Sequence, residues 1–117
     1  MDNIKNDAYY LKQMIEDIEF IISETKYIEL DEFKKDEVLN FAVDFKFIQL
    51  SESTKRLSYE LIIDNPNIPW NQIVGLRNKI VHEYENVVLD MVYNTAKDDL
   101  PILIVQLKEL LNKLDKE

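Results

Sequence analysis

The stretch that decides the fold class is Asn3-Ile-Lys-Asn-Asp-Ala-Tyr-Tyr-Leu-Lys-Gln-Met-Ile-Glu-Asp-Ile-Glu-Phe-Ile-Ile-Ser-Glu-Thr25. Its apolar residues recur every three or four positions, which places them in one stripe along a helix. They are Ile4, Ala8, Leu11, Ile15, Ile18 and Ile22. Charged residues such as Lys12, Glu16, Asp17 and Glu19 lie off that stripe. The segment therefore predicts one long amphipathic helix with a single buried face.

The rest of the chain continues this pattern. Helical spacing predicts further helices over residues 35–59, 70–83 and 89–97, and a last helix that ends near residue 114. Asp31 or Asp36 is the expected N-terminal cap of the second helix. The connection 64–69 contains two prolines, which exclude a regular helix there. Pro101 is expected to break or kink the chain between the last two helices.

Composition supports an all-helical reading. The chain has 117 residues, 46% of them apolar, and contains a single glycine. Sheet proteins need many tight turns, and tight turns need glycine. We therefore expect an all-α fold in one domain spanning residues 1–117.

Charge and targeting signals narrow the class of protein. The chain has no Cys, no basic segment followed by an apolar run at its start, and no apolar run long enough for a membrane span. We expect a cytoplasmic protein that does not associate with membranes. The net charge of −9 argues against a broad surface for polyanions. A small local basic site is still compatible, because charges are screened beyond about 8–10 Å.

The second predicted helix carries a charged continuation of its apolar face. The inner face is predicted to contain Val38, Phe41, Ala42, Phe45 and Ile48. The same spacing then reaches Glu52, Arg56 and Tyr59. An acid and a base thus stand at positions where periodicity predicts burial.

An arginine interrupts the apolar face of the third predicted helix. At about 100° per residue, Arg77 falls inside the arc that contains Ile73, Ile80 and Val81. Arginine is almost never fully buried without a partner, so Arg77 needs a carboxylate, a subunit boundary or an anionic ligand. A structural ion pair with Glu52 is one reading, and a functional site is the other.

The same segment holds the only histidine. His82 points to a different side of the helix from Arg77, and it is the one side chain here whose ordinary pKa lies near neutrality. A lone His or Tyr is more often a surface or packing residue than a catalyst. One Gly excludes a glycine-rich phosphate loop, and one His without Cys excludes a His/Cys metal cluster. No metal or cofactor is expected, although the 23 acidic residues leave a carboxylate magnesium site open.

Residues 77–84, Arg77-Asn-Lys-Ile-Val-His82-Glu-Tyr84, read as Arg, four residues, His, one residue and Tyr. This pattern resembles the signature of the HEPN superfamily, and more narrowly the HepT-like toxins encoded beside a minimal nucleotidyltransferase (MNT) antitoxin. The likeness extends over Ile68–His82, over Ala42–Glu52 with Lys55–Ser58, and over Asp98–Pro101. Within this context the short motif is specific.

The resemblance implies an up-and-down bundle of four or five helices that forms a homodimer. It implies a metal-independent endoribonuclease whose cleft at the dimer interface binds RNA, with Arg77 and His82 as catalytic residues. Glu52 and Asn78 would support them. It also implies that a cognate MNT nucleotidyltransferase silences the toxin by binding it and adenylylating Tyr84.

Two positions depart from the family pattern. Glu83 follows the motif His where relatives commonly have Gly, and Phe45 stands where the second helix commonly carries Arg. Both changes make the expected cleft less positive. Two other functions stay open: a non-catalytic HEPN module that binds a nucleotide or a partner protein, and a helical dimer in which Arg77 and Glu52 are merely structural.

Overall fold

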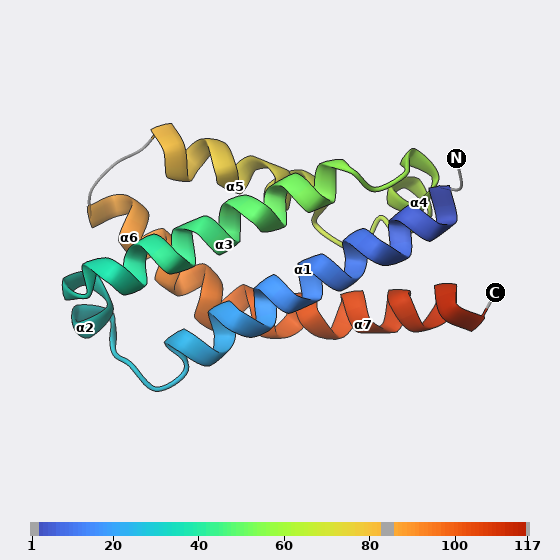
Figure 1. The fold of residues 1–117 in the computed structure, drawn as a ribbon. Helices are drawn as coiled ribbons and strands as arrows, with labels where there is room; N and C mark the ends of the chain where they lie inside the picture. Colours follow the sequence, from blue (N-terminus) through green and yellow to red (C-terminus); the bar gives the residue numbers. More distant parts are fainter. Residues whose placement is uncertain (1–2, 83–85, 117) are drawn as a thin grey trace.

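Four antiparallel helical passes form the bundle in the computed structural model, which describes residues 3–82 and 86–116 (Figure 1). The first three passes are α1 (Asn3–Thr25), α3 (Glu37–Lys55) and α5 (Trp70–His82). The fourth pass runs through α6 (Asn86–Asn94), η1 (Thr95–Asp99) and α7 (Leu100–Lys116). Two short helices, α2 (Leu30–Lys35) and α4 (Tyr59–Asp64), lie at opposite ends of the bundle. The all-α, up-and-down prediction is confirmed.

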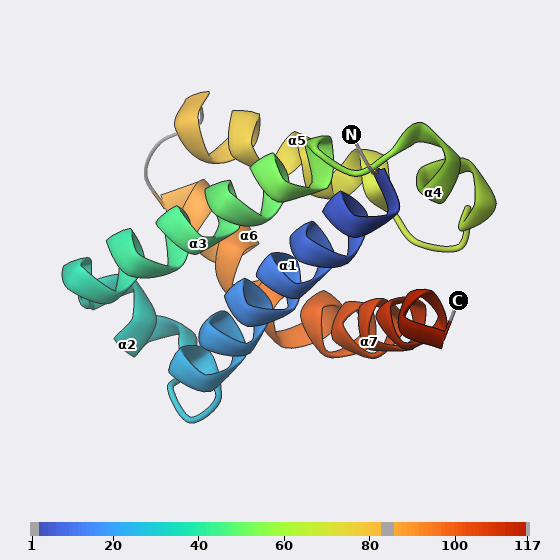
Figure 2. The same ribbon diagram turned by 45° about the vertical axis from the view of Figure 1, so that its right-hand side comes forward.

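The core lies between α1, α3 and α7, with α5 covering the free side of α3 (Figure 2). Helix α1 buries Leu11, Met14, Ile15, Ile18 and Ile21, largely the stripe that its sequence predicts. The fully buried residues of the opposing helices include Val43, Phe47, Leu50 and Leu107. These side chains belong to one continuous apolar cluster. No helix within the described ranges is long and apolar enough to cross a membrane.

The second predicted helix, residues 35–59, is shorter in the structure, where it corresponds to α3, and the short helices α2 and α4 flank it. Asp36 separates α2 from α3 and caps α3, because its Oδ1 accepts a hydrogen bond from the Leu39 N–H at 3.0 Å. Ser58 caps α4 in the same way through the Leu61 N–H. Residues 30–33, which lie between the first two predicted helices, therefore belong to a helix of their own, α2, while the cap at Asp36 is confirmed.

The N-terminal helix is attached to the α3–α4 junction by a buried carboxylate. Asp7 accepts hydrogen bonds from the Ser58 N–H at 2.7 Å and from the Ser58 hydroxyl at 2.6 Å. The following proline loop is fixed by Trp70, whose indole N–H donates to the carbonyl of Asn65 at 2.9 Å. These contacts determine where α5 begins, and so where its functional residues lie.

Pro101 neither breaks nor sharply ends the fourth pass. The chain widens into the π-helical segment η1, in which the Leu100 N–H bonds to the carbonyl of Thr95. A wider turn avoids the clash between a proline ring and the carbonyl four residues earlier. The helix consequently continues from α6 into α7 (Figure 1).

The predicted inner face of α3 is wrong. Val38, Phe41 and Phe45 are exposed by 79%, 65% and 57%, and Glu52 and Arg56 are exposed as well. The helix instead buries Val43, Phe47, Leu50, Ser51 and Thr54, which lie on its opposite side. Both faces of α3 are apolar along most of their length, so their spacing alone does not identify the buried one.

Candidate active site

Arg77 lies on the side of α5 that faces α3. Near it, the Ser51 hydroxyl of α3 donates a hydrogen bond of 2.7 Å to the carbonyl of Ile73, which holds the two helices in register. The apolar positions around Arg77 are buried at Ile73 and Ile80, as predicted. The Arg77 side chain itself is 39% exposed, because it extends along the edge of the helix pair to solvent. The expectation of a buried arginine is therefore wrong.

Glu52 is the acidic partner of this arginine. Its Oε1 lies 3.9 Å from Arg77 Nε, and its Oε2 lies 3.5 Å from Lys55 Nζ, one turn further along α3. One carboxylate thus stands between two cations. Sequence reasoning named Arg77 and Glu52 but missed Lys55, which the i to i+3 spacing from Glu52 would have indicated.

Asn78 contacts the arginine from the neighbouring position. Its side-chain oxygen accepts a hydrogen bond of 3.3 Å from Arg77 Nη1. Both residues are accessible to solvent. The remaining guanidinium nitrogen, Nη2, has no partner among the described residues. The guanidinium is therefore held on two sides and is still free to bind an anion.

His82 is the last residue of α5 and is exposed. It stands five positions after Arg77, which places the two side chains about 140° apart around the helix axis. Among the described residues, His82 has no hydrogen-bond or ion-pair partner. A single copy therefore does not bring Arg77 and His82 together. Tyr84 and Glu83 lie outside the described residues.

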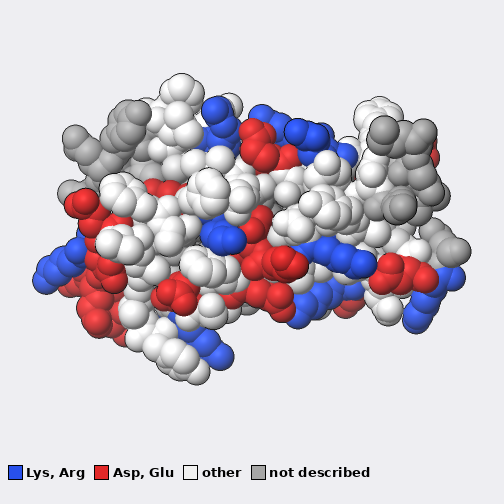
Figure 3. All heavy atoms as spheres, in the orientation of Figure 1, with Lys and Arg blue, Asp and Glu red and all other residues white. Residues whose placement is uncertain are grey.

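A hollow between two helices lies close to the motif but does not include its described signature residues. A cavity of about 580 Å³ opens between α5 and α7, but neither Arg77 nor His82 lines it. Arg77 instead contacts Glu52, which lies on the same side of α3 as the exposed Phe41 and Phe45. Figure 3 shows uncharged surface along α3 and positive groups gathered at the edge where α3 and α5 meet.

One carboxyl group of α3 has an unusual proton affinity. Burial raises the pKa of Asp44 from 3.8 to about 6. Its Oδ1 is buried and has no hydrogen-bond partner among the described residues. A carboxyl in this setting favours its neutral form.

Comparison with known proteins identifies the family. The family model described as "Ribonuclease HepT-like" matches residues 14–110. This chain belongs to the HepT-like family. This HepT-like chain is 33% identical over 110 residues to "Putative RNase TTE0752" of Caldanaerobacter subterraneus subsp. tengcongensis. The matched region covers 94% of this chain and 98% of the relative.

A second relative is "Probable ribonuclease HepT" of Thermococcus cleftensis. It is 31% identical over 94 residues, which cover 80% of this HepT-like chain and 86% of the relative. "Putative RNase MJ1216" of Methanocaldococcus jannaschii is 26% identical over 106 residues, or 91% of this chain and 88% of the relative. No solved structure shows a significant match. Family membership, which the motif at residues 77–84 predicted, is confirmed.

Proposed function

We propose that this chain is a HepT-like endoribonuclease toxin that acts as a homodimer and cleaves RNA without a metal ion. Membership of a ribonuclease family and the names of its relatives support RNA as the substrate. One observation supports the dimer most directly: Glu52, the partner of Arg77, lies on the side of α3 that also carries a bare apolar stripe, Val38, Phe41 and Phe45. Contiguous apolar patches on a protein surface usually mark an interaction site.

The occupant of this stripe is a second copy of the chain. Val38, Phe41 and Phe45 lie on successive turns of one helix side, and each is more than half exposed. A two-fold axis at a helix face lets the same stripe contact itself. Such a dimer places the α5 helices of both copies at the interface between them. This arrangement explains how a motif that diverges within one helix becomes a single site.

The chemistry of metal-free RNA cleavage matches these residues. A base takes the proton of the 2′-hydroxyl, the 2′-oxygen attacks phosphorus, and an acid protonates the leaving 5′-oxygen. The products are a 2′,3′-cyclic phosphate and a 5′-hydroxyl. In our proposal, the His82 imidazole of one copy takes up the first proton and then delivers it to the leaving oxygen, next to Arg77 of the other copy. Arg77, oriented by Glu52 and Asn78, stabilises the charge that develops on the phosphate oxygens.

The cleavage step has a direct test. The purified protein should cleave single-stranded RNA in excess EDTA and leave 2′,3′-cyclic phosphate ends. Replacing the 2′-hydroxyl at the scissile position by hydrogen should prevent cleavage there. The variant His82→Ala should lose at least about 100-fold in rate while its helical circular dichroism is unchanged. Unaltered cleavage by His82→Ala would exclude the proposed mechanism.

Control of this activity is assigned to an MNT nucleotidyltransferase antitoxin that transfers AMP to Tyr84. Tyr84 stands two residues after His82, so an attached AMP would add bulk and negative charge beside the cleavage site. Co-expression with a genomically adjacent nucleotidyltransferase should increase the intact mass by one or more AMP groups. The gain should be absent in Tyr84→Phe. An unchanged mass, or a gain that survives Tyr84→Phe, would contradict this assignment.

A further inference from the structure

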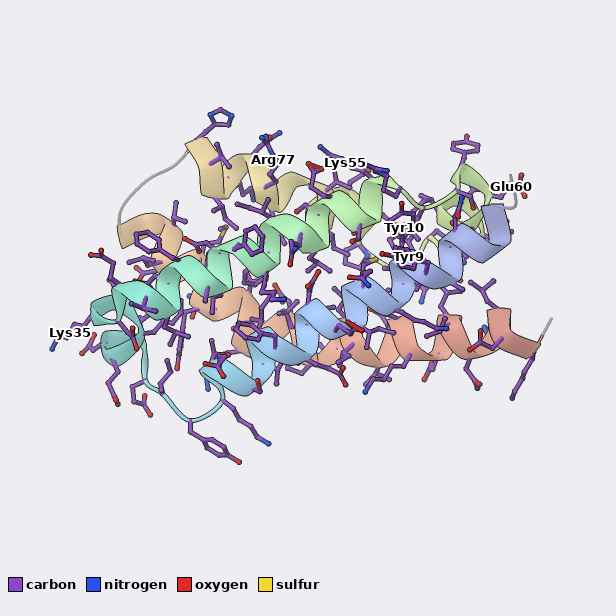
Figure 4. The ribbon with its side chains drawn as sticks, viewed as in Figure 1. Tyr9, Tyr10, Lys35, Lys55, Glu60 and Arg77 are labelled. Carbon is purple, nitrogen blue, oxygen red and sulfur yellow. The ribbon has the colours of Figure 1, made fainter. Side chains whose placement is uncertain are left out.

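Positive charge collects at one edge of an otherwise acidic molecule. Arg77 and Lys55 lie next to one another at this edge and share the single carboxylate of Glu52, at 3.9 and 3.5 Å (Figure 4). Their side chains are about half exposed. Two cations on one carboxylate leave a net positive charge that an incoming anion can bind.

A third cation extends this group along α3. Arg56 follows Lys55, ends the helix as its C-cap, and is exposed. Within the described chain its guanidinium has no hydrogen-bond or ion-pair partner. Arg56 and Arg77 are the only two arginines in the sequence. Arg56 stands four positions after Glu52 and hence on the same side of α3, so both arginines belong to this edge although the chain carries a net charge of −9.

An exposed aromatic ring follows the cations. Tyr59 is the first residue of α4 and is 77% exposed. It stands only three positions after Arg56, so their Cα atoms are at most about 11 Å apart. Alternating cations and aromatic rings are the usual surface for single-stranded nucleic acid, because phosphates bind the cations and bases stack on the rings.

We infer that Lys55, Arg56 and Tyr59 form a track for single-stranded RNA that continues from Arg77 towards α4. Lys55 and Arg56 bind phosphates beside the scissile one, and Tyr59 stacks on a base. The inference rests on the proposed function, because it takes Arg77 as the site of the scissile phosphate. It assigns three substrate-binding residues that lie outside the Arg–His–Tyr motif.

Charge limits the track to a narrow ligand. Glu60 is exposed in the first turn of α4 and lies near the far end of the edge, away from Arg77 (Figure 4). Acidic groups beyond this short basic edge would repel the second strand of a duplex. A flexible single strand can follow the edge and avoid them. If Lys55 served only in its exposed ion pair with Glu52, its replacement would not change RNA binding. It would also change stability little, because exposed ion pairs contribute little to stability.

The test uses the intact protein and 2′-O-methyl oligoribonucleotides of two, four, eight and twelve nucleotides, which lack the attacking hydroxyl. Binding is followed by fluorescence anisotropy at several salt concentrations. The track variants are the double change Lys55→Gln/Arg56→Gln and the single change Tyr59→Ala. Matched controls are Lys35→Gln/Lys113→Gln, which removes two exposed cations elsewhere, and Tyr27→Ala, which removes another exposed ring.

We expect the double variant to bind the octamer at least about tenfold more weakly. The slope of log Kd against log salt should fall by about 1.4, or about 0.7 for each lost phosphate contact. Tyr59→Ala should weaken octamer binding at least about fivefold. The losses should grow with oligonucleotide length and appear in KM rather than kcat for a cleavable octamer. The control variants should stay within about twofold of wild type.

Three outcomes distinguish the track from the proposed function. If the track variants bind like the controls while His82→Ala abolishes cleavage, the track is wrong and the ribonuclease proposal stands. If track and control variants lose RNA affinity equally, the effect comes from the net charge of the protein, and the track is wrong. A wild-type protein that neither binds nor cleaves single-stranded RNA would contradict both.

Discussion

Arg77 of α5 and Glu52 of α3 form an ion pair across two helices, with Nε and Oε1 3.9 Å apart and both side chains in contact with solvent. Solvent exposure decides what this pair can do. A buried pair broken from one side costs about 3–5 kcal/mol, whereas an exposed pair contributes about 0–1 kcal/mol. The geometry therefore does not support a mainly structural role for Arg77.

The first prediction separates these roles. Arg77→Ala should lower the free energy of unfolding by less than about 1 kcal/mol, measured by urea denaturation. It should reduce RNA cleavage by about 100-fold or more, because it removes the cation that faces the developing phosphate charge. If the free energy of unfolding falls by several kcal/mol while the folded fraction still cleaves RNA, the role of Arg77 is structural.

The second prediction concerns the exposed stripe of α3. Phe41→Glu/Phe45→Glu should dissociate the dimer and abolish cleavage, because it places charge in an apolar interface. Both rings are exposed in the single chain, so the helical content should not change. Light scattering after size exclusion measures the mass. The matched control is Ile102→Glu/Val105→Glu on α7, whose side chains are also more than half exposed and which should remain dimeric. A wild-type monomer, or a dimer that tolerates the Phe changes, would exclude this interface.

The third prediction follows from the buried carboxyl of Asp44. Its folded-state pKa of about 6 lies above the ordinary value of 3.8, so the folded state keeps a proton that the unfolded state loses. Stability should therefore fall as pH rises from about 4 to about 6, and then level off. The full shift corresponds to about 3 kcal/mol, and partial solvation reduces this to about 1–2 kcal/mol.

Replacing this carboxyl should remove the effect. Asp44→Asn should be more stable than wild type at pH 8 by about 1–2 kcal/mol, with a flatter pH profile of thermal unfolding. The exposed Asp115→Asn serves as the control and should keep the wild-type profile. If Asp44→Asn is less stable at pH 8, the carboxylate is compensated by a contact and the raised pKa is wrong.

The fourth prediction tests the attachment of α1 to the α3–α4 junction. Asp7→Ala leaves the N–H and the hydroxyl of Ser58 without their acceptor and should cost about 3 kcal/mol. Ser58→Ala should cost less on its own, and the double variant should be less destabilised than the sum of both. Additive effects in urea unfolding would show that these two residues do not interact.

Much of the fold follows from the sequence because α1 and α7 each have one apolar face. The ends of α1, the loop before Trp70 and the start of α5 match their predictions, since capping and proline rules act locally. The predicted buried face of α3 is wrong because Phe45 and Phe47 lie on nearly opposite sides of the helix and both are apolar. Only tertiary packing decides between two such faces.

The candidate site was predicted in part for a related reason. Helical spacing correctly placed Arg77 on the side of α5 that faces Glu52. It did not predict that the long Arg77 side chain reaches solvent along the edge of the helix pair. It also placed Asp17 among exposed charges, whereas the structure buries Asp17 beside Lys46, with 3.6 Å between Nζ and Oδ1. Burial of this carboxyl raises its pKa despite the nearby lysine.

The central claim is that Arg77 and His82 act together only across two copies of the chain, and mixing inactive variants tests it most directly. Arg77→Ala and His82→Ala proteins are unfolded together, refolded and assayed on single-stranded RNA in EDTA. Random assembly gives half heterodimers, each with one complete site, so about a quarter of wild-type activity should return. If subunits exchange, as a tag on one variant would show, and no activity returns, the shared site is contradicted.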